Sequence, residues 1–258
     1  YLYVMLDVFS RYVVGWMVAP GESAELARKL IQESIDKQGV LPGQLHIHAE
    51  SKGIAPLVLL PGDPNRAKYL AETFLENAKL YNDNRQLLGY TGMYQGIPVS
   101  IQTTGMGCPS LSIVVEEIIK LGAKTLIRIG TTGIISRAVK PGELVIAMSA
   151  SPLEGTTKMY LNNLPYAPTA SFNVVRKLVE AAESQGLEHH VGLINTEDAF
   201  YATLPEHVQR YEDIGVLSVE MEAAALFLIG KLRKVETGCI LVASNYIGYP
   251  QLVEASIM

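Results

Sequence analysis

The stretch that most constrains the fold of this chain is residues 99–133, VSIQTTGMGCPSLSIVVEEIIKLGAKTLIRIGTTG. A short apolar run at 99–102 is followed by a turn at 103–107, whose glycines adopt backbone conformations that other residues avoid. Apolar residues then recur at helical spacing over 110–121, and a second apolar run covers 125–129. Parallel strands need a crossover of this kind, so the pattern predicts a strand–turn–helix–strand unit in a parallel sheet.

Two residues mark the predicted ends of this helix. Ser110 is of the type that caps helix N-termini, because its hydroxyl accepts a hydrogen bond from an unpaired backbone amide. Gly122 follows the last apolar position and is of the type that ends helices. We therefore expect the helix to begin beside Ser110 and to stop at Gly122.

Arg128 is the charged residue of the second apolar run, TLIRIG. Ligands of parallel sheets bind outside the carboxyl ends of the strands, so residues 103–107 and 130–133 should border one crevice. A buried guanidinium is costly unless it meets an anion. Arg128 therefore predicts either a bound phosphate or carboxylate ligand, or a structural ion pair with an internal Glu.

The composition is that of a globular α/β protein with one large domain or two smaller ones. Lys and Arg number 21 against 26 Asp and Glu, and this net charge of −5 argues against nucleic-acid binding by bulk electrostatics. Two distant cysteines suit a reducing, cytoplasmic compartment and match no metal spacing. We expect neither a membrane helix, which needs roughly 18 apolar residues, nor a signal peptide.

A second candidate anion site lies in the sequence LLPGDPNRA. The pattern predicts a strand at 57–60, a tight turn at 61–64 and a helix over 65–75, with Arg66 in its first turn. A cation there opposes the helix dipole, unless an anion sits between it and the amide of Gly62. The alternative is a surface arginine.

Three further groups of residues follow predicted strands. Glu220 and Glu222 begin a strongly apolar helix, where they either complement its dipole or accept hydrogen bonds from sugar hydroxyls. Phe200 and Tyr201 either stack on a base or pack in the core. Residues 244–246, Ser-Asn-Tyr, end another strand with polar groups.

Residues 1–45 differ from the rest: they predict two strands within 1–18, joined by a turn at 9–11, and an amphipathic helix over 22–38. The run YLYVMLDVFSRYVVGWMVAP resembles the integrase-like catalytic core of insertion-sequence transposases. Those enzymes hold divalent metals with three separated carboxylates, of which this chain matches one, Glu50. We therefore expect no metal site and no strand transfer, and, without an excess of basic residues, no DNA binding by this segment.

Residues 46–258 resemble the hexameric, bacterial type of purine nucleoside phosphorylase. Six blocks occur in the family's order: LLPGDPNRAKYLAETFL, NRQLLGYTGMYQG, TTGMGCPSLSIVVEEI, IRIGTTG, EDAFYA and VEMEAAAL. The resemblance implies a three-layer α/β/α core with a mixed central sheet and a dimer-built hexamer. It also implies that the family's last helix is missing, and that inorganic phosphate is a co-substrate with no cofactor or metal.

The resemblance also implies residue roles. Phosphate should be bound by Gly62, Arg66, Arg128 and Thr131, with Arg85 contributed by a neighbouring subunit. His46, also from a neighbour, should approach the ribose 5′-hydroxyl. His46 and His48 alone do not make a metal site. Asn245, Arg128 and Glu222 should be catalytic. The nucleoside should otherwise contact Met106, Thr132, Gly133, Phe200, Val219, Glu220, Met221 and Ser244.

The implied reaction is phosphorolysis of purine nucleosides to a free base and ribose 1-phosphate. Many relatives have an Asp that protonates N7 where this chain has Asn245, so we expect a preference for inosine and guanosine over adenosine. The Arg that follows in such relatives falls on Met258. Two alternatives stay open: a relative acting on methylthioadenosine or uridine, and an inactive fusion that binds only nucleosides, transposase subunits or DNA.

Overall fold

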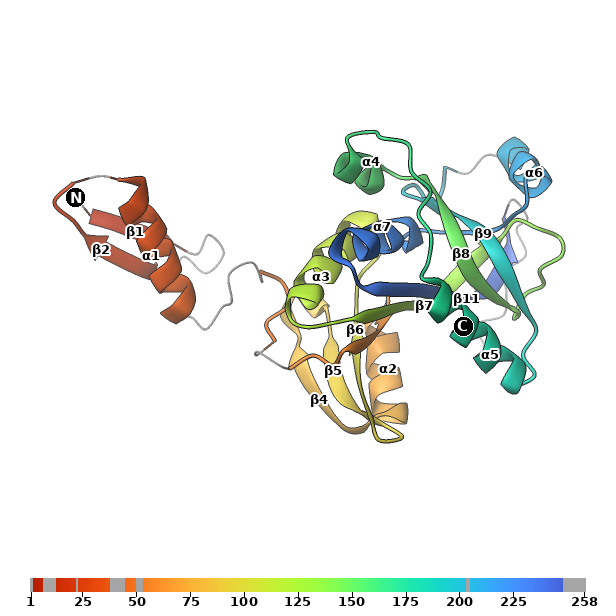
Figure 1. Ribbon diagram of the computed structural model, residues 1–258, viewed down its shortest axis with the longest axis horizontal. Coiled ribbons are helices and arrows are strands. Elements are labelled where there is room, and N and C mark those ends of the chain that lie inside the picture. Colours follow the sequence, from red (N-terminus) through yellow and green to blue (C-terminus); the bar gives the residue numbers. More distant parts are fainter. Residues whose placement is uncertain are drawn as a thin grey trace. The chain divides into compact units, whose positions relative to one another are not determined.

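The computed structural model describes residues 2–6, 13–21, 23–37, 45–49, 53–202 and 205–247. The chain divides into two compact units, Tyr1–His48 and Ala49–Met258, which are described separately (Figure 1). The predicted turn at 9–11, the helix limits Glu22 and Gln38, and the residues Glu50 and Met258 lie outside the described residues.

The smaller unit contains a hairpin and a helix, as the sequence predicts. Strands β1 (Leu2–Leu6) and β2 (Val13–Val18) pair antiparallel, and helix α1 (Ala24–Lys37) packs on them. Gly15 allows this approach, because a Cβ there would lie 1.8 Å from the Ser34 hydroxyl. Several large apolar side chains of the hairpin are exposed, namely Leu2, Val4, Val13, Trp16 and Val18.

The larger unit is built on a mixed nine-stranded sheet, which confirms the predicted fold class. The strand order is β10-β9-β8-β11-β7-β3-β6-β5-β4. The strands are β3 (Leu57–Pro61), β4 (Glu76–Asn82), β5 (Gly89–Tyr94), β6 (Ile97–Gln102), β7 (Thr125–Ile134), β8 (Leu144–Leu153), β9 (His189–Glu197), β10 (Val216–Glu220) and β11 (Glu236–Tyr246).

The strands at the centre of the sheet are parallel. At one edge the sheet curls back, so that β10 also pairs with the central strand β7. Strand β3 pairs parallel with β6 and β7, and β11 pairs parallel with β7. Strand β10 also pairs antiparallel with β7, through Ser218 with Ile134 and Val219 with Gly133. Because β10 runs back along β7, its last residue, Glu220, is carried toward Arg128 in the middle of β7.

Helices cover both sides of the sheet (Figure 1). Figure 1 shows α3, α4 and α7 on one side and α2 and α5 on the other, an arrangement in three layers. Helix α7 is the central one, with all of its residues from Ala223 to Gly230 buried. The helices are α2 (Pro64–Phe74), α3 (Cys108–Lys120), α4 (Gly155–Leu161), α5 (Phe172–Ser184), α6 (Pro205–Asp213) and α7 (Ala223–Arg233).

The predicted start of helix α3 is wrong. The helix begins at Cys108 with Gly107 as the capping residue, and the Ser110 hydroxyl donates instead to the carbonyl of Thr104 at 2.6 Å. Pro109 favours the earlier start, because its fixed φ suits the first helical turn and its missing N–H costs nothing there. The predicted stop is confirmed: α3 ends at Lys120, and Gly122 has a φ of +114°.

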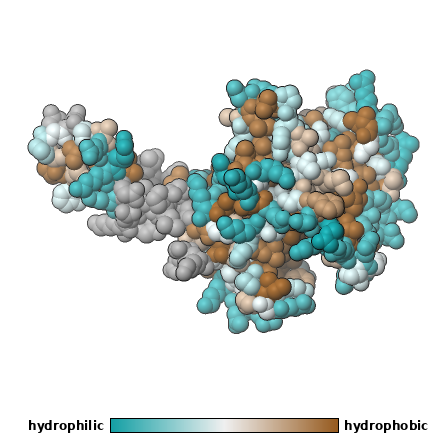
Figure 2. Space-filling view, viewed as in Figure 1, coloured by the Kyte–Doolittle hydropathy of each residue, from teal (hydrophilic) through white to brown (hydrophobic). Residues whose placement is uncertain are grey.

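Hydrophobic side chains reach the surface of the larger unit in several places (Figure 2). Large exposed apolar residues include Met106, Met159, Phe172, Phe200 and Tyr201. Of these, Met106, Phe200 and Tyr201 belong to the site described below. Within the described part of the chain, no helix has both the length and the apolar character that a membrane crossing requires.

Candidate active site

One cavity of about 770 Å³ brings most of the predicted site residues together. It opens where β3, β7 and β11 end, as expected for the carboxyl edge of parallel strands. Every predicted residue except Arg85 and His46 lines it. These are Gly62, Arg66, Met106, Arg128, Thr131, Thr132, Gly133, Phe200, Val219, Glu220, Met221, Glu222, Ser244 and Asn245.

The turn after β3 forms one wall of this cavity. Asp63 caps helix α2 by accepting a hydrogen bond from the amide of Asn65 at 2.9 Å, and half-buried Arg66 follows in the first turn. Gly62 packs closely against the second glycine turn, since a Cβ there would lie 3.1 Å from the carbonyl oxygen of Gly105. The wall thus combines a helix N-terminus with a cation, the pattern of an anion-binding site.

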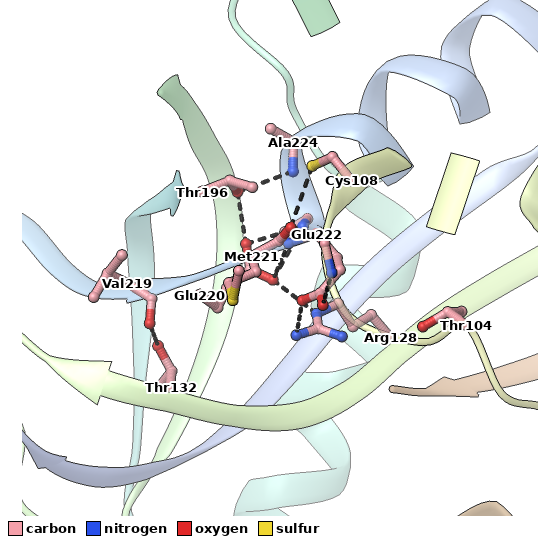
Figure 3. Close-up of polar contacts among 12 residues, drawn as sticks. Thr104, Cys108, Arg128, Thr132, Thr196, Val219, Glu220, Met221, Glu222 and Ala224 are labelled. Carbon is pink, nitrogen blue, oxygen red and sulfur yellow. Dashed lines mark hydrogen bonds and ion pairs between the residues drawn. The ribbon is translucent and has the colours of Figure 1, made fainter. Parts of the chain in front are cut away.

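Arg128 lies at the centre of the site, between two carboxylates (Figure 3). Its Nε donates to Glu220 Oε2 at 2.7 Å, and its Nη2 forms an ion pair with Glu222. Burial by itself would lower the pKa of Arg128, but Glu222 and Glu220 raise it above its usual value. The internal ion pair foreseen as one alternative is therefore present, and Arg128 also lines the cavity where an anion would enter.

Glu220 is held by a dense set of hydrogen bonds (Figure 3). Besides Arg128, its carboxylate accepts from the Thr196 hydroxyl at 2.6 Å and from the backbone amides of Glu222 and Ala223 at 2.8 and 2.9 Å. Because these amides begin helix α7, Glu220 neutralises the helix N-terminus, as the dipole interpretation predicts. Its oxygens are therefore committed within the protein.

Glu222 is buried but has fewer contacts. Its Oε1 accepts a hydrogen bond from the amide of Gly107 at 2.7 Å, at the start of α3, and its Oε2 faces Arg128. Burial raises the pKa of Glu222 and Glu220 adds to the effect, while Arg128 and the Gly107 amide oppose it. The carboxylate therefore joins the start of helix α3 to Arg128.

The opposite end of the cavity presents hydroxyl, amide and aromatic groups. The Thr132 hydroxyl donates to the carbonyl of Val219 at 2.8 Å, and the Ser244 hydroxyl lies 3.0 Å from both the Thr132 carbonyl and Asn245 Oδ1. Phe200 is 71% exposed at the rim, so core packing does not explain it. An aromatic side chain beside an amide suits a flat heterocycle.

Arg85 and His46 are not among the residues that line this cavity. Arg85 is exposed in a short 3-10 turn, Asn84–Gln86, with a φ of +54°. His46 belongs to the smaller compact unit. Both are expected to act on a neighbouring subunit, so their roles stay predictions.

The sequence analysis did not identify Thr196 and Cys108, which contact Glu220 and Met221 of the site. Thr196 links Glu220 to helix α7, since its hydroxyl also accepts from the amide of Ala224 at 3.1 Å. The buried thiol of Cys108 lies 3.3 Å from the Met221 carbonyl (Figure 3), and burial raises the pKa of that thiol. The sequence signal for Thr196 was its position in the run NTED, directly before the block EDAFYA.

Among the residues that the structure describes, no three His, Cys, Asp or Glu side chains group closely enough to hold a metal ion. The two carboxylates of the site face a guanidinium, which takes the place that a cation would occupy.

Comparisons with known proteins identify the family of the chain. The phosphorylase superfamily model matches residues 56–256, which lie within the larger unit. A DeoD-type purine nucleoside phosphorylase of Exiguobacterium sp. is 47% identical over 204 residues, 79% of this chain and 86% of that protein. Those of Caldanaerobacter subterraneus subsp. tengcongensis and Clostridium novyi are 48% and 44% identical, each over 78% of this chain and 87% of the relative. The chain therefore belongs to the phosphorylase superfamily, with DeoD-type purine nucleoside phosphorylases as its homologues.

Proposed function

We propose that this chain catalyses the phosphorolysis of purine nucleosides, giving a free base and ribose 1-phosphate. The observation that carries the proposal is that Arg66, Arg128, Glu222 and Asn245 line one cavity, although they come from distant parts of the chain. Such a cavity offers cations for phosphate, a carboxylate for sugar hydroxyls and an amide for a base. The relatives named purine nucleoside phosphorylase support the same assignment.

In this reaction the glycosidic bond stretches first, which leaves a cationic sugar ring and an electron-rich purine. Phosphate bound by Gly62, Arg66, Arg128 and Thr131 would supply the nucleophile and a compensating negative charge beneath the ring. Holding it there converts an encounter between two molecules into a reaction within one complex. Glu222 and Met106 would fix the ribose, so that its anomeric carbon faces the phosphate.

Asn245 would act on the departing base. Its amide can donate a hydrogen bond to N7 or O6 of a purine but cannot deliver a proton. A donor aimed at charge that develops in the transition state is worth on the order of 3 kcal/mol. Inosine and guanosine have an acceptor at position 6, whereas adenosine has an amino group, so 6-oxopurines should be preferred.

The proposal includes an assembly and a setting. Arg85 and His46 would complete a neighbouring subunit's site in a dimer-built hexamer. The two free thiols, Cys108 and Cys239, suit a reducing cytoplasmic compartment. Residues 1–45 would be a remnant of a transposase integrase core, packed loosely or used as an oligomer contact.

A substrate panel tests this function. The full chain is incubated with phosphate and inosine, guanosine, adenosine, methylthioadenosine or uridine, and base release is followed chromatographically while light scattering gives the mass. We expect phosphate-dependent release, with kcat/KM for inosine and guanosine above that for adenosine. A larger kcat/KM for adenosine would reject the 6-oxopurine preference, a preference for uridine or methylthioadenosine would favour the related phosphorylases, and no release would favour an inactive fusion.

A further inference from the structure

Around Arg128 the site contains more acidic than basic side chains. One buried guanidinium faces two buried carboxylates, Glu220 at 2.7 Å from Nε and Glu222 at Nη2 (Figure 3). A phosphate entering this cavity would therefore meet two like charges beside the cation that attracts it. Like charges at contact distance in a buried site are strongly unfavourable, so one carboxylate has to move away or take up a proton.

Glu220 is not the group that gives way. Moving its carboxylate would break the hydrogen bonds from Thr196, Glu222 and Ala223 and would expose the N-terminus of the buried helix α7. Buried amides that lose their acceptor are energetically costly. Glu220 therefore stays paired with Arg128 Nε whether or not the cavity is filled.

Glu222 is held far more lightly. Within the described part of the chain its carboxylate contacts the Gly107 amide through Oε1 and Arg128 through Oε2, and it interacts with the Glu220 side chain. Its backbone is the N-cap of α7, with the carbonyl accepting from the amide of Leu226, but its side chain makes no capping bond to α7. Rotation of this side chain therefore breaks few contacts.

We propose, building on the phosphorylase function above, that Glu222 occupies the position on Arg128 that phosphate takes, and that phosphate binding releases its carboxylate to the ribose hydroxyls. Glu222 is then an internal stand-in for phosphate when the site is empty. It becomes a sugar ligand once phosphate has arrived. Phosphate thereby prepares the nucleoside site.

This exchange couples the two substrates. When the ribose hydroxyls of a nucleoside bind Glu222, this carboxylate no longer competes with phosphate for Arg128. When phosphate binds Arg128, the carboxylate of Glu222 becomes free to bind the ribose hydroxyls. By linkage the two effects are equal: each substrate tightens the binding of the other by the same factor, which for coupled sites is typically about 5 to 150. A site with independent subsites would show a factor of one.

Calorimetric titration of the full chain with inorganic phosphate measures this factor. The titration is done with and without a C-nucleoside, in which a carbon–carbon bond replaces the glycosidic bond and prevents turnover. For the unmodified chain we expect the Kd of phosphate to fall at least about fivefold when the C-nucleoside is present. Equal Kd values in the two titrations would overturn the proposal, and this result does not depend on any variant folding.

The variant Glu222→Gln separates the exchange from other sources of coupling. Without the C-nucleoside it should bind phosphate at least about fivefold more tightly than the unmodified chain, because a neutral amide competes weakly for Arg128. Its coupling factor should fall below about two. An unchanged Kd for phosphate would contradict the stand-in role.

Asp63→Asn is the matched control. It makes the same acid-to-amide change in the wall of the same cavity, and it keeps an oxygen for the amide of Asn65. We expect it to retain the coupling of the unmodified chain, and loss of coupling in it would show that general charge, not Glu222, is responsible.

If the unmodified chain releases base from inosine but shows no coupling between phosphate and the C-nucleoside, the exchange alone is wrong. If it neither binds phosphate nor releases base, the proposed function fails as well.

Discussion

The buried guanidinium of Arg128 contacts two carboxylates, and these differ in how many other hydrogen bonds hold them in place. Glu220 is fixed by amides and a hydroxyl, whereas Glu222 has the Gly107 amide and the arginine. Because both carboxylates raise the pKa of Arg128 against the effect of burial, the arginine stays charged throughout the physiological range. Its availability to phosphate is therefore set by competition with Glu222, not by its own titration.

Asn245 is the residue where base preference can be changed. In the variant Asn245→Asp, a carboxyl group that can carry a proton replaces an amide that cannot release one. We expect kcat/KM for adenosine relative to inosine to rise at least about tenfold, equivalent to roughly 1.4 kcal/mol in the barrier. Steady-state rates with both nucleosides measure this ratio.

The control for this change is Asn245→Ala, which removes the side chain's donor and acceptor together. It should lower kcat/KM for inosine without the gain for adenosine. A ratio that stays constant in both variants would mean that Asn245 does not face the purine.

At the scale of elements, the joint between β10 and α7 positions the site. Glu220 ends the strand, Ala223 begins the helix, and the carboxylate of Glu220 holds both together while it pairs with Arg128. The strand reaches Arg128 because β10 pairs with the far part of β7 at Gly133. The sheet closure therefore creates the charge cluster.

Glu220→Ala should destabilise the larger unit strongly. The change leaves the amides at the start of α7 without their acceptor and removes one partner of a buried ion pair, a loss of about 3 to 5 kcal/mol. Urea unfolding followed by circular dichroism measures the free energy of unfolding. Glu222→Ala is the comparison: it should cost less, because Arg128 keeps Glu220 and one amide, that of Gly107, loses its partner. Equal losses would show that Glu220 has no special role in holding α7.

At the scale of the whole molecule, we expect the two units of the chain to differ strongly in stability. The smaller unit has one hairpin and one helix, and two-stranded sheets are marginally stable on their own. Its hairpin also exposes large apolar side chains, including Trp16 at 66%. The larger unit buries its helix α7 against a nine-stranded sheet.

Limited proteolysis should therefore remove the smaller unit first. We expect fragments that begin near residue 49 and persist, identified by mass spectrometry of the digest over time. Added phosphate should slow any cleavage of the larger unit, because a ligand stabilises the folded state that binds it. Rapid cleavage throughout Ala49–Met258, with Tyr1–His48 intact, would contradict this order of stability.

Local pattern was sufficient for most elements and for the chemistry of most site residues. Helical spacing predicted α3, and a lone charge in an apolar run singled out Arg128. Both features depend on residues that are neighbours along the chain, so the sequence alone reveals them. The predicted limits were less accurate: the strand predicted at 125–129 extends to Ile134, since pairing with β10 prolongs it.

By itself, the sequence determined most of the residues that line the cavity: one arginine after a glycine turn, one arginine inside an apolar strand, a pair of acidic residues before an apolar helix, and an amide at a strand end. Only the tertiary structure decided how they are paired. Arg128 and Glu220 are 92 positions apart, and Gly107 and Glu222 are 115 apart. No local preference specifies such contacts, because they arise when β10 closes onto β7. That closure places Glu222 against Arg128, as the proposed exchange with phosphate requires.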